Sequence, residues 1–207
     1  MDKSKSLISG IGNLTETKNY YDIWSNEYDF TLKKWNYRVP KKSANLLIKK
    51  LTSKPKNILD LACGTGLFGE ELINVYNKSQ IYGLDISKKS LIVAKKKNIY
   101  KNLIKANFEN RQVYNIKFDL VSLIGSMTYC KKFERFFSNV YFYLAKNGHF
   151  IFSHRIDLWD RQKFDDILQN LSKYFKVKFI SRPQSYLPLN KDFKNKIKIR
   201  LVLLQKY

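Results

Sequence analysis

The sequence predicts an α/β protein, a single Rossmann-like domain with a doubly wound, mostly parallel sheet of seven strands. Two observations favour this fold class. Short apolar runs alternate with segments of helical periodicity from residue 57 onward, and a glycine turn at residues 64–66 joins the first run to the first helical segment. With 207 residues the chain can bury one substantial core, so we expect one domain with N-terminal helices and an antiparallel C-terminal strand pair.

The residues before the sheet divide into an arm and a helical cap. Residues 1–16 mix Ser, Gly, Asn and Lys without periodicity, which predicts a flexible N-terminal arm. Residues 17–53 are first rich in aromatic side chains and then place Ala44, Leu47 and Leu51 at helical spacing. We expect one or two helices in this cap.

Residues 55–155 carry the alternating strands and helices of the core. One helix is predicted from a cap at Ser87 to about Lys97, and another from about Lys132 to Ala145. Because helices separate the strands, the strands should run parallel. The predicted strands are residues 58–61, 81–85, 102–105, 118–122 and 149–153.

Residues 156–207 follow a different pattern. A helix is predicted around residues 161–174, and two apolar strands at 177–180 and 197–204. The connection between these strands contains prolines and no clear crossover helix, so the two strands should pair in antiparallel orientation.

The strongest motif is Asp-Leu-Ala-Cys-Gly-Thr-Gly at residues 60–66. A glycine turn between a strand end and a helix N-terminus lets a ligand approach the backbone and meet unpaired N–H groups. Asp85 ends the next strand, where a carboxylate can accept hydrogen bonds from both ribose hydroxyls. Gly64, Gly66 and Gly69 also match the spacing of dinucleotide sites, so the glycines alone leave NAD open.

The residues around these glycines resemble motif I of the class I S-adenosylmethionine-dependent methyltransferases. Later features follow in that family's order: Ala-Asn-Phe at 106–108, where the family often places Ala-Asp beside the adenine, and Ile-Gly-Ser-Met at 124–127, in the loop that lines the reaction centre. The resemblance implies a methyltransferase domain over residues 17–207 with S-adenosyl-L-methionine as its cofactor. Asn107 replaces the usual acid, but its amide oxygen can still accept a hydrogen bond, so we expect weakened adenine binding.

The cap also carries a motif. Tyr-Asp-x-Trp-x-x-x-Tyr-Asp at residues 21–29, followed by Tyr-Arg-Val-Pro at 37–40, resembles the N-terminal signature of small methyltransferases related to the Williams–Beuren-region methyltransferase-like proteins. An aromatic helix could close over the cofactor, exclude water and attract the sulfonium by cation–π contact. The same spacing fits a helix that packs into the core, and both interpretations stay open.

These features give the candidate site. His154 is the candidate catalytic residue, a general base, because it follows the fifth strand at the carboxyl edge, next to Arg155. No metal is expected, and Cys63 and Cys130 should be free thiols. The candidate cofactor-binding residues are Tyr21, Trp24, Tyr28, Asp60, Ala62, Cys63, Gly64, Gly66, Asp85, Ile86, Asn107, Phe108 and Ile124.

The expected function is methyl transfer to a small-molecule acceptor by direct displacement, because the sulfonium is intrinsically reactive and the protein mainly aligns the reactants. The fourth-strand loop lacks the Asp/Asn-Pro-Pro-Tyr/Phe tetrad, which disfavours methylation of adenine amino groups. Two alternatives remain: a methyltransferase for RNA or another macromolecule, and a cofactor-binding protein of the same fold without catalysis.

The charge of +22 with a pI near 9.9 is typical of nucleic-acid binders. The basic side chains are spread along the whole chain, however, and arginine is scarce, as AT-rich codon usage would produce. We therefore expect weak, nonspecific nucleic-acid binding that is lost with salt. The absence of a long apolar run or a secretory signal predicts no membrane association and a cytoplasmic location; the oligomeric state stays open.

Overall fold

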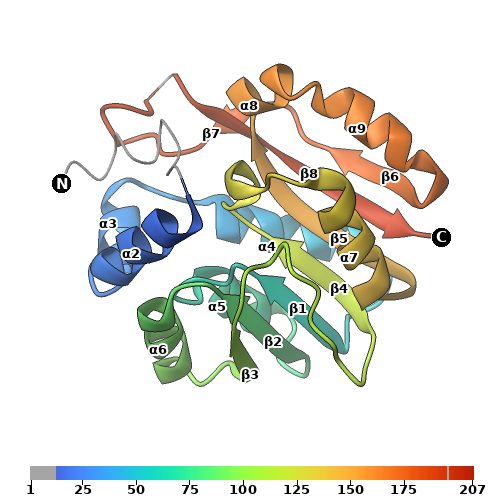
Figure 1. Cartoon of the computed structure of the whole chain (residues 1–207), viewed down its shortest axis with the longest axis horizontal. Helices are drawn as coiled ribbons and strands as arrows, with labels where there is room; N and C mark the ends of the chain where they lie inside the picture. The colour runs from blue at the N-terminus through green and yellow to red at the C-terminus, as the bar shows by residue number, and fades with distance from the viewer. Residues whose placement is uncertain (1–12, 195) are drawn as a thin grey trace.

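A computed structural model describes residues 13–194 and 196–207 and confirms the predicted fold class. The central sheet has the order β3-β2-β1-β4-β5-β8-β6, and the short β7 pairs with β8 (Figure 1). The first five strands pair in parallel, whereas β8 is antiparallel to β5, β6 and β7. The strands are β1 (Asn57–Leu61), β2 (Gln80–Asp85), β3 (Tyr100–Lys105), β4 (Phe118–Leu123), β5 (Leu144–Arg155), β6 (Phe175–Ile180), β7 (Gln184–Ser185) and β8 (Lys198–Lys206).

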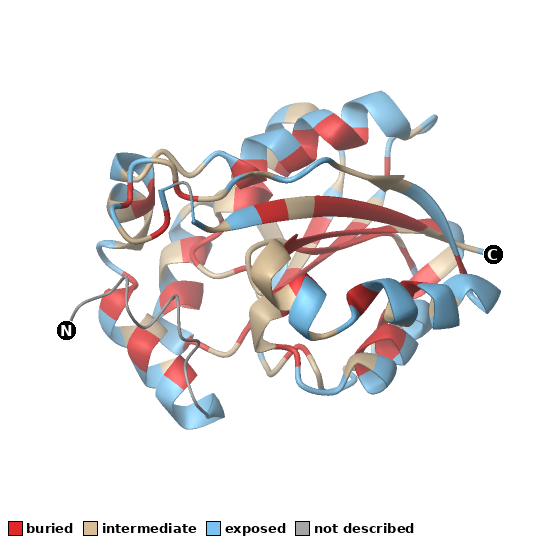
Figure 2. Ribbon diagram, turned by 90° about the horizontal axis from the view of Figure 1, so that it is seen from above, coloured by how far each residue is buried: buried red, intermediate tan, exposed pale blue. Residues whose placement is uncertain are grey.

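Helices surround this sheet, and their outward faces are exposed while the strands are mostly buried (Figure 2). The α-helices are α2 (Leu14–Trp24), α3 (Tyr28–Lys34), α4 (Val39–Lys50), α5 (Leu67–Val75), α6 (Lys88–Lys96), α7 (Phe133–Tyr143), α8 (Ile156–Arg161) and α9 (Phe164–Asn170). Two short 3-10 helices, η1 (Met127–Tyr129) and η2 (Leu171–Lys173), complete the set. Within the described ranges, none of these helices is long and apolar enough to cross a membrane.

The cap begins earlier than predicted. Helix α2 starts at Leu14 because the side chain of Asn13 accepts a hydrogen bond from the Glu16 N–H and caps the helix. Residues 13–16 therefore belong to the cap and not to the predicted arm of residues 1–16, whose remaining part lies outside the described residues. The cap also holds three described helices, where one or two were expected.

Two other predicted boundaries are wrong. Helix α7 ends at Tyr143, and the residues up to 148, Ala145 among them, extend β5 well before the predicted start at residue 149. The predicted helix around residues 161–174 is divided, because Lys163 adopts a left-handed conformation with φ of 49° between α8 and α9. Helical periodicity continues across such a break, so the sequence pattern did not reveal it.

Apolar side chains cover both faces of the sheet. Along β1, Ile58 packs with α4 and α5 on one face, while Leu59 and Leu61 join the cluster under α7 on the other face. This alternation is the period-2 geometry of a strand. Full burial of each such side chain stabilises the fold by about 1.5–3 kcal/mol. Because both faces of the sheet are covered, the parallel strands appear in the sequence as continuous apolar runs.

The cap has a small core of its own. Tyr20, Trp24 and Leu32 from α2 and α3 pack with Leu187 and Phe193 from the segment between β7 and β8. Figure 1 shows this segment and the cap helices at the same end of the molecule. The N-terminal helices α2 and α3 and the segment between β7 and β8 are thus joined by apolar packing beside the sheet.

Gly69 permits close packing between α5 and β3. A Cβ atom at this position would collide with the Tyr100 ring, 2.6 Å from its Cζ, and would lie 2.9 Å from Ile99 Cδ1. The Tyr100 hydroxyl in turn donates a hydrogen bond to Asp60. The glycine therefore keeps the ring in the position from which it supports the end of β1.

Replacing Gly69 by alanine tests this contact. In most helices alanine is preferred to glycine by about 1 kcal/mol, but here the added methyl group overpacks against Tyr100. We expect Gly69→Ala to lower the free energy of unfolding by about 1–2 kcal/mol, measured by urea denaturation. The loss of stability should be smaller in a Tyr100→Phe background, because that substitution removes the hydroxyl oxygen, the atom nearest to the added methyl group. A Gly69→Ala protein that is more stable than the wild type would contradict the packing argument.

Candidate functional site

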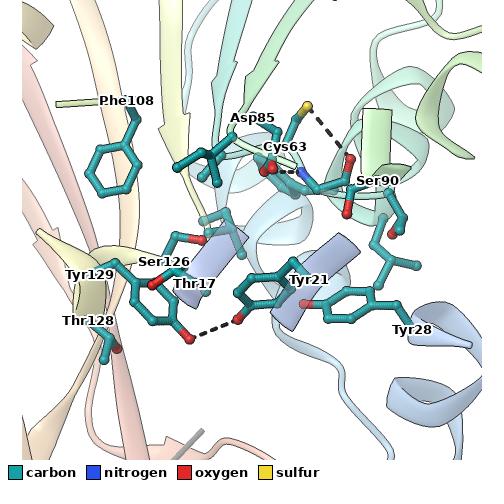
Figure 3. A pocket seen from close by; sticks show the side chains of 18 of the residues that line it. Thr17, Tyr21, Tyr28, Cys63, Asp85, Ser90, Phe108, Ser126, Thr128 and Tyr129 are labelled. Carbon is teal, nitrogen blue, oxygen red and sulfur yellow. Dashed lines mark hydrogen bonds between the residues drawn. The ribbon is translucent and has the colours of Figure 1, made fainter. Parts of the chain in front are cut away.

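A cavity of about 240 Å³ lies where the carboxyl ends of β1, β2, β4 and β5 meet. Side chains of the cap helices close it from the other side (Figure 3), and Tyr186 and Leu187 of the segment after β7 also line it. Open parallel sheets bind ligands at this position. All predicted cofactor-binding residues except Gly66 line it: Tyr21, Trp24, Tyr28, Asp60, Ala62, Cys63, Gly64, Asp85, Ile86, Asn107, Phe108 and Ile124.

The glycine turn after β1 has two different parts. Gly64, at φ +55°, faces open space, since a Cβ there would meet no atom within 4 Å. Gly66, at φ +92°, does not line the cavity: its N–H donates to the Cys63 carbonyl, and a Cβ would approach the Tyr100 ring at 3.2 Å. Gly66 therefore shapes the turn and starts α5, while Gly64 leaves the backbone accessible to a ligand.

Asp85 stands at the carboxyl end of β2 with its carboxylate held in place. It accepts hydrogen bonds from the Gly64 N–H at 2.9 Å and from the Ser87 N–H at 2.7 Å. Burial nevertheless raises the pKa of Asp85 to about 6, an effect larger than that of the backbone donors. The carboxylate is thus oriented, buried and short of counter-charge.

Asp60 occupies the corresponding position at the end of β1. The Tyr100 hydroxyl donates to its Oδ2 at 2.8 Å, and the Ser122 hydroxyl donates to its Oδ1 at 2.7 Å. Burial raises the pKa of Asp60 to about 6, and the charge of Asp85 adds to this rise. Two buried carboxylates on adjacent strands face one cavity, which is the kind of perturbed cluster found at functional sites.

Asn107 and Phe108 line the cavity after β3. The amide oxygen of Asn107 accepts a hydrogen bond from the Glu109 N–H at 3.0 Å, which forms a local turn. One lone pair of that oxygen is still able to accept a second donor. The side chain of Phe108 packs edge-on against Phe136 and supplies an apolar wall.

Two aspartates fasten the cap to the loops that border the cavity. Asp22 on α2 accepts hydrogen bonds from the Ser87 hydroxyl at 2.6 Å and from the Lys89 N–H at 3.2 Å, at the N-terminus of α6. Asp29 on α3 accepts from the Thr65 hydroxyl at 2.5 Å and pairs with Lys97 at 2.7 Å. Both aspartates belong to the cap motif, but no pattern in the sequence indicates their partners.

The aromatic residues of the cap line the cavity and also pack into the core of the cap. Tyr21 and Tyr28 line the cavity, and the Tyr21 hydroxyl lies 2.8 Å from the hydroxyl of Tyr129 on η1 (Figure 3). Trp24 lines the cavity too, but it is only 1% exposed and contributes to the core of the cap. Side chains of α2 and of the first residue of α3 therefore provide packing and the roof of the cavity together.

His154 is not placed as predicted. Its side chain does not line the cavity: it is 1% exposed, packs against Trp159 and Phe164, and its Nε2 lies 3.0 Å from Gln162 Oε1. Burial lowers its pKa to about 4, which leaves the ring neutral. Because neighbouring residues on a strand point to opposite faces, Arg155 reaches the cavity and His154 does not.

The half of the cavity beside β4 and β5 contains residues that sequence reasoning missed. Arg155 lines it and forms a bidentate pair with Asp157, at 3.0 Å from Nε and 2.6 Å from Nη2. Tyr37 from the cap and Tyr186 from the segment after β7 also line it and contact each other edge-on. Tyr186 is remote from every motif, so no sequence signal could have indicated it.

Comparison with known proteins identifies relatives of this chain. A family model described as a methyltransferase domain matches residues 52–195. Methyltransferase-like protein 27 of Homo sapiens is 30% identical over 123 residues, which cover 58% of this chain and 50% of the human protein. A malonyl-[acyl-carrier protein] O-methyltransferase of Legionella pneumophila is 40% identical over 70 residues, covering 32% of this chain and 25% of that enzyme. The matches thus span half or less of these curated relatives.

Solved structures match over more of the chain. The N-methyltransferase NodS from Bradyrhizobium japonicum, in complex with S-adenosyl-L-homocysteine, superposes with a TM-score of 0.64 at 15% identity, covering 100% of this chain and 99% of NodS. An S-adenosylmethionine-dependent methyltransferase from Clostridium acetobutylicum gives a TM-score of 0.63 at 17% identity, covering 91% and 98%. The sheet, the glycine turn and the family match agree, and the chain therefore belongs to the methyltransferase domain family.

Proposed function

We propose that this chain is an S-adenosylmethionine-dependent methyltransferase that transfers a methyl group to a small-molecule acceptor by direct displacement. The observation that carries the proposal is the pairing of the open Gly64 turn with the oriented Asp85 carboxylate at the edge of one cavity. The relatives support it, because their names include a malonyl-[acyl-carrier protein] O-methyltransferase and an N-methyltransferase.

The residues present fit this cofactor. A carboxylate such as Asp85, buried and short of counter-charge, is suited to accept hydrogen bonds from a ribose diol. At the Gly64 turn the backbone is not covered by any side chain. Asn107 provides a polar contact and Phe108 an apolar contact for the adenine of the cofactor. Asp60 would lie toward the amino-acid portion, where its charge complements an ammonium group.

When bound, S-adenosylmethionine supplies an electrophilic methyl group on a sulfonium. The part of this chain is to bind, orient and exclude water. Asp85 and the Gly64 turn fix one side of the cavity, and the aromatic roof of Tyr21, Trp24 and Tyr28 keeps the opposite side dry and attracts positive charge. Asp22 and Asp29 hold that roof in position.

An assay for S-adenosylhomocysteine formed in the presence of a small-molecule cell extract tests the function. Product formation supports catalysis, whereas binding without product would favour the alternative of a non-catalytic cofactor-binding protein. Binding of NAD in place of S-adenosylmethionine by well-folded protein would contradict the proposal. RNA or another macromolecule as acceptor remains the second alternative.

Removal of the Asp85 carboxylate should weaken cofactor binding. Hydrogen bonds to a charged acceptor are worth about 1.5–3 kcal/mol each, so we expect Asp85→Ala to raise the dissociation constant for S-adenosylhomocysteine roughly tenfold or more. Calorimetry measures this value, and the thermal unfolding curve shows whether the variant is folded. The matched control is Asp165→Ala on α9, which removes one exposed carboxylate far from the cavity lining. Equal affinity in Asp85→Ala and the control would rule out the proposed role.

The same carboxylate should affect stability in a pH-dependent way. The pKa of Asp85 is raised from 3.8 to about 6 by burial, so between these values the folded protein without ligand binds more protons than the unfolded chain. Its contribution to the free energy of unfolding therefore falls as pH rises from about 4 to 6, by up to about 3 kcal/mol. Urea denaturation across this range should show that the free energy of unfolding of Asp85→Asn rises relative to that of the wild type as pH rises. A difference between the two proteins that does not change with pH would contradict the ionisation of a buried Asp85 carboxylate.

The basic surface leads to one further expectation. We propose that this chain acts in the cytoplasm. We also propose that it binds nucleic acids weakly and without sequence preference. A charge of +22 releases counterions from any polyanion, so binding should appear at low ionic strength and decline steeply as salt increases. Titrations of unrelated RNA and DNA sequences at several salt concentrations measure this. One RNA retained at physiological salt far better than the others would favour the macromolecular alternative.

A further inference from the structure

The end of the sheet opposite the cavity carries aromatic and basic side chains. Lys117 directly precedes β4, the last turn of α7 directly precedes β5, and Lys206 ends β8, which runs antiparallel to β5. These positions lie at the amino ends of β4 and β5, whereas the cavity lies at their carboxyl ends. Figure 1 shows the C-terminus on the side of the molecule away from α2 and α3.

Six side chains of this region form a continuous series of contacts. Nζ of Lys206 lies 4.0 Å from the ring centroid of Tyr141, whose ring contacts that of Tyr174 with centroids 5.7 Å apart. The next residue along the chain, Phe142, has Nζ of Lys117 at 3.9 Å from its ring centroid. We call these side chains the aromatic-basic patch, which consists of Lys117, Tyr141, Phe142, Lys173, Tyr174 and Lys206.

Two further contacts add positive charge to the same rings. Nζ of Lys173 lies 5.0 Å from the ring centroid of Tyr174. At the other end of the series, Cζ of Arg111 lies 4.6 Å from the ring centroid of Phe142. Each of the three rings therefore has at least one cation beside it.

No carboxylate balances these four cations within the ranges that the structure describes. None of the four takes part in an ion pair there. Asp or Glu is absent from all four segments that form the patch, residues 110–118, 136–149, 171–180 and 198–207. Asp119, just beyond one segment, accepts hydrogen bonds from the N–H groups of Lys56 and Asn57. Basic residues are spread along the sequence, but the fold gathers four acid-free segments at one place.

The lysines of the patch affect one another. Burial lowers the pKa of Lys206, and the positive charge of Lys117 adds to this effect. Both lysines also donate hydrogen bonds to backbone carbonyls at the C-terminal end of α7, at distances of 2.6–3.0 Å. They therefore stabilise the helix end, where cations are favoured by the helix dipole.

Capping of α7 does not account for the whole patch. The ammonium of Lys173 donates no hydrogen bond to the described residues, and the ring of Tyr174 beside it is 45% exposed. Tyr141 and Phe142 are each 36% exposed, although a helix end needs no exposed ring. Partly exposed rings beside uncompensated cations are thus left for a partner.

This combination favours one kind of partner. Cations attract the phosphates of any polynucleotide, but only an unpaired strand also offers bases that can stack on aromatic rings. The rings pack against one another and against the lysine side chains, so they lie along the surface and do not project from it as side chains that enter a bilayer do. The surface therefore complements a single strand better than a duplex or a lipid headgroup layer.

We infer that the aromatic-basic patch binds single-stranded nucleic acid, with phosphates against its lysines and bases stacked on its exposed rings. The inference goes beyond methyl transfer, because β4, six residues or about 20 Å long, separates the patch from the cavity. A strand bound there leaves the cavity free. The patch gives a location to the weak nucleic-acid binding proposed above.

Removal of the patch charges tests this location. We expect the triple variant Lys117→Gln, Lys173→Gln and Lys206→Gln to bind an oligouridylate of about 15 nucleotides at least tenfold more weakly at low salt. The slope of log K against log salt concentration should also become less steep by about 2, since each phosphate contact on a single strand contributes about 0.7. Fluorescence anisotropy titrations at several salt concentrations measure both quantities.

The matched control removes the same charge elsewhere. Lys41→Gln, Lys42→Gln and Lys49→Gln change three exposed lysines of α4, which packs on the face of the sheet opposite to α7. This control should keep the salt slope of the wild type within about 0.5. Equal weakening and equal slopes in the two triple variants would overturn the location.

Replacement of a ring tests base stacking without a change of charge. Tyr174→Leu should lower the affinity for the oligouridylate at least fivefold and leave the affinity for duplex DNA of the same length within twofold. The matched control is Phe30→Leu on α3, an exposed ring outside the patch with Nζ of Lys34 at 4.4 Å from its centroid. Tyr141→Leu covers the case in which Tyr174→Leu does not fold. Single-strand affinities equal to that of the control in both tyrosine variants would overturn the stacking role.

Calorimetry with S-adenosylhomocysteine separates this inference from the proposed function. All patch variants should bind S-adenosylhomocysteine within twofold of the wild type, and saturating oligouridylate should not change that affinity. Competition between the two ligands would overturn the location. A wild type that binds oligouridylate at the patch but not S-adenosylhomocysteine would contradict the proposed function alone. Binding to vesicles of phosphatidylserine and phosphatidylcholine, without preference for single strands over duplex, would overturn the inference in favour of a membrane surface.

Discussion

The pocket depends on two hydrogen-bonded carboxylates that join the cap to the sheet. Asp22 bonds to the N-terminus of α6, after β2, and Asp29 bonds to Thr65 in the glycine turn after β1. Each aspartate directly follows a tyrosine that lines the cavity, so fixing the aspartate also fixes the aromatic roof. A carboxylate at a helix N-terminus gains from unpaired N–H groups and from the helix dipole. Without these contacts α2 and α3 would be held mainly by the small apolar core with Leu187 and Phe193.

Below the aromatic roof lie two carboxyl groups whose burial disfavours their charged form. Asp60 and Asp85 are both buried, and burial raises both pKa values to about 6. A ligand that supplies hydroxyl or ammonium donors to these carboxylates would recover part of the solvation that burial removes.

The two halves of the cavity differ in chemistry because they come from different strands. The half at β1 and β2 presents carboxylates and open backbone, and the half at β4 and β5 presents phenols and a guanidinium. The central position of β1 in the sheet places a boundary between them.

The sequence by itself determined the elements that depend on local pattern: the alternation of strands and helices, the glycine turn, the cap at Ser87 and the strand-end position of Asp85. The sequence pattern made the predicted N-terminal arm too long, because Asn13, the N-cap residue of α2, is a single polar residue in a polar stretch. The sequence pattern predicted that His154 faces the cavity at the end of β5, whereas Arg155 does so. The order of the strands does not show which of these two adjacent side chains points into the cavity. Only the tertiary structure decided the partners of Asp22, Asp29, Arg155 and Tyr186, because each of their contacts joins segments far apart in the chain or depends on the direction of a side chain in the folded sheet.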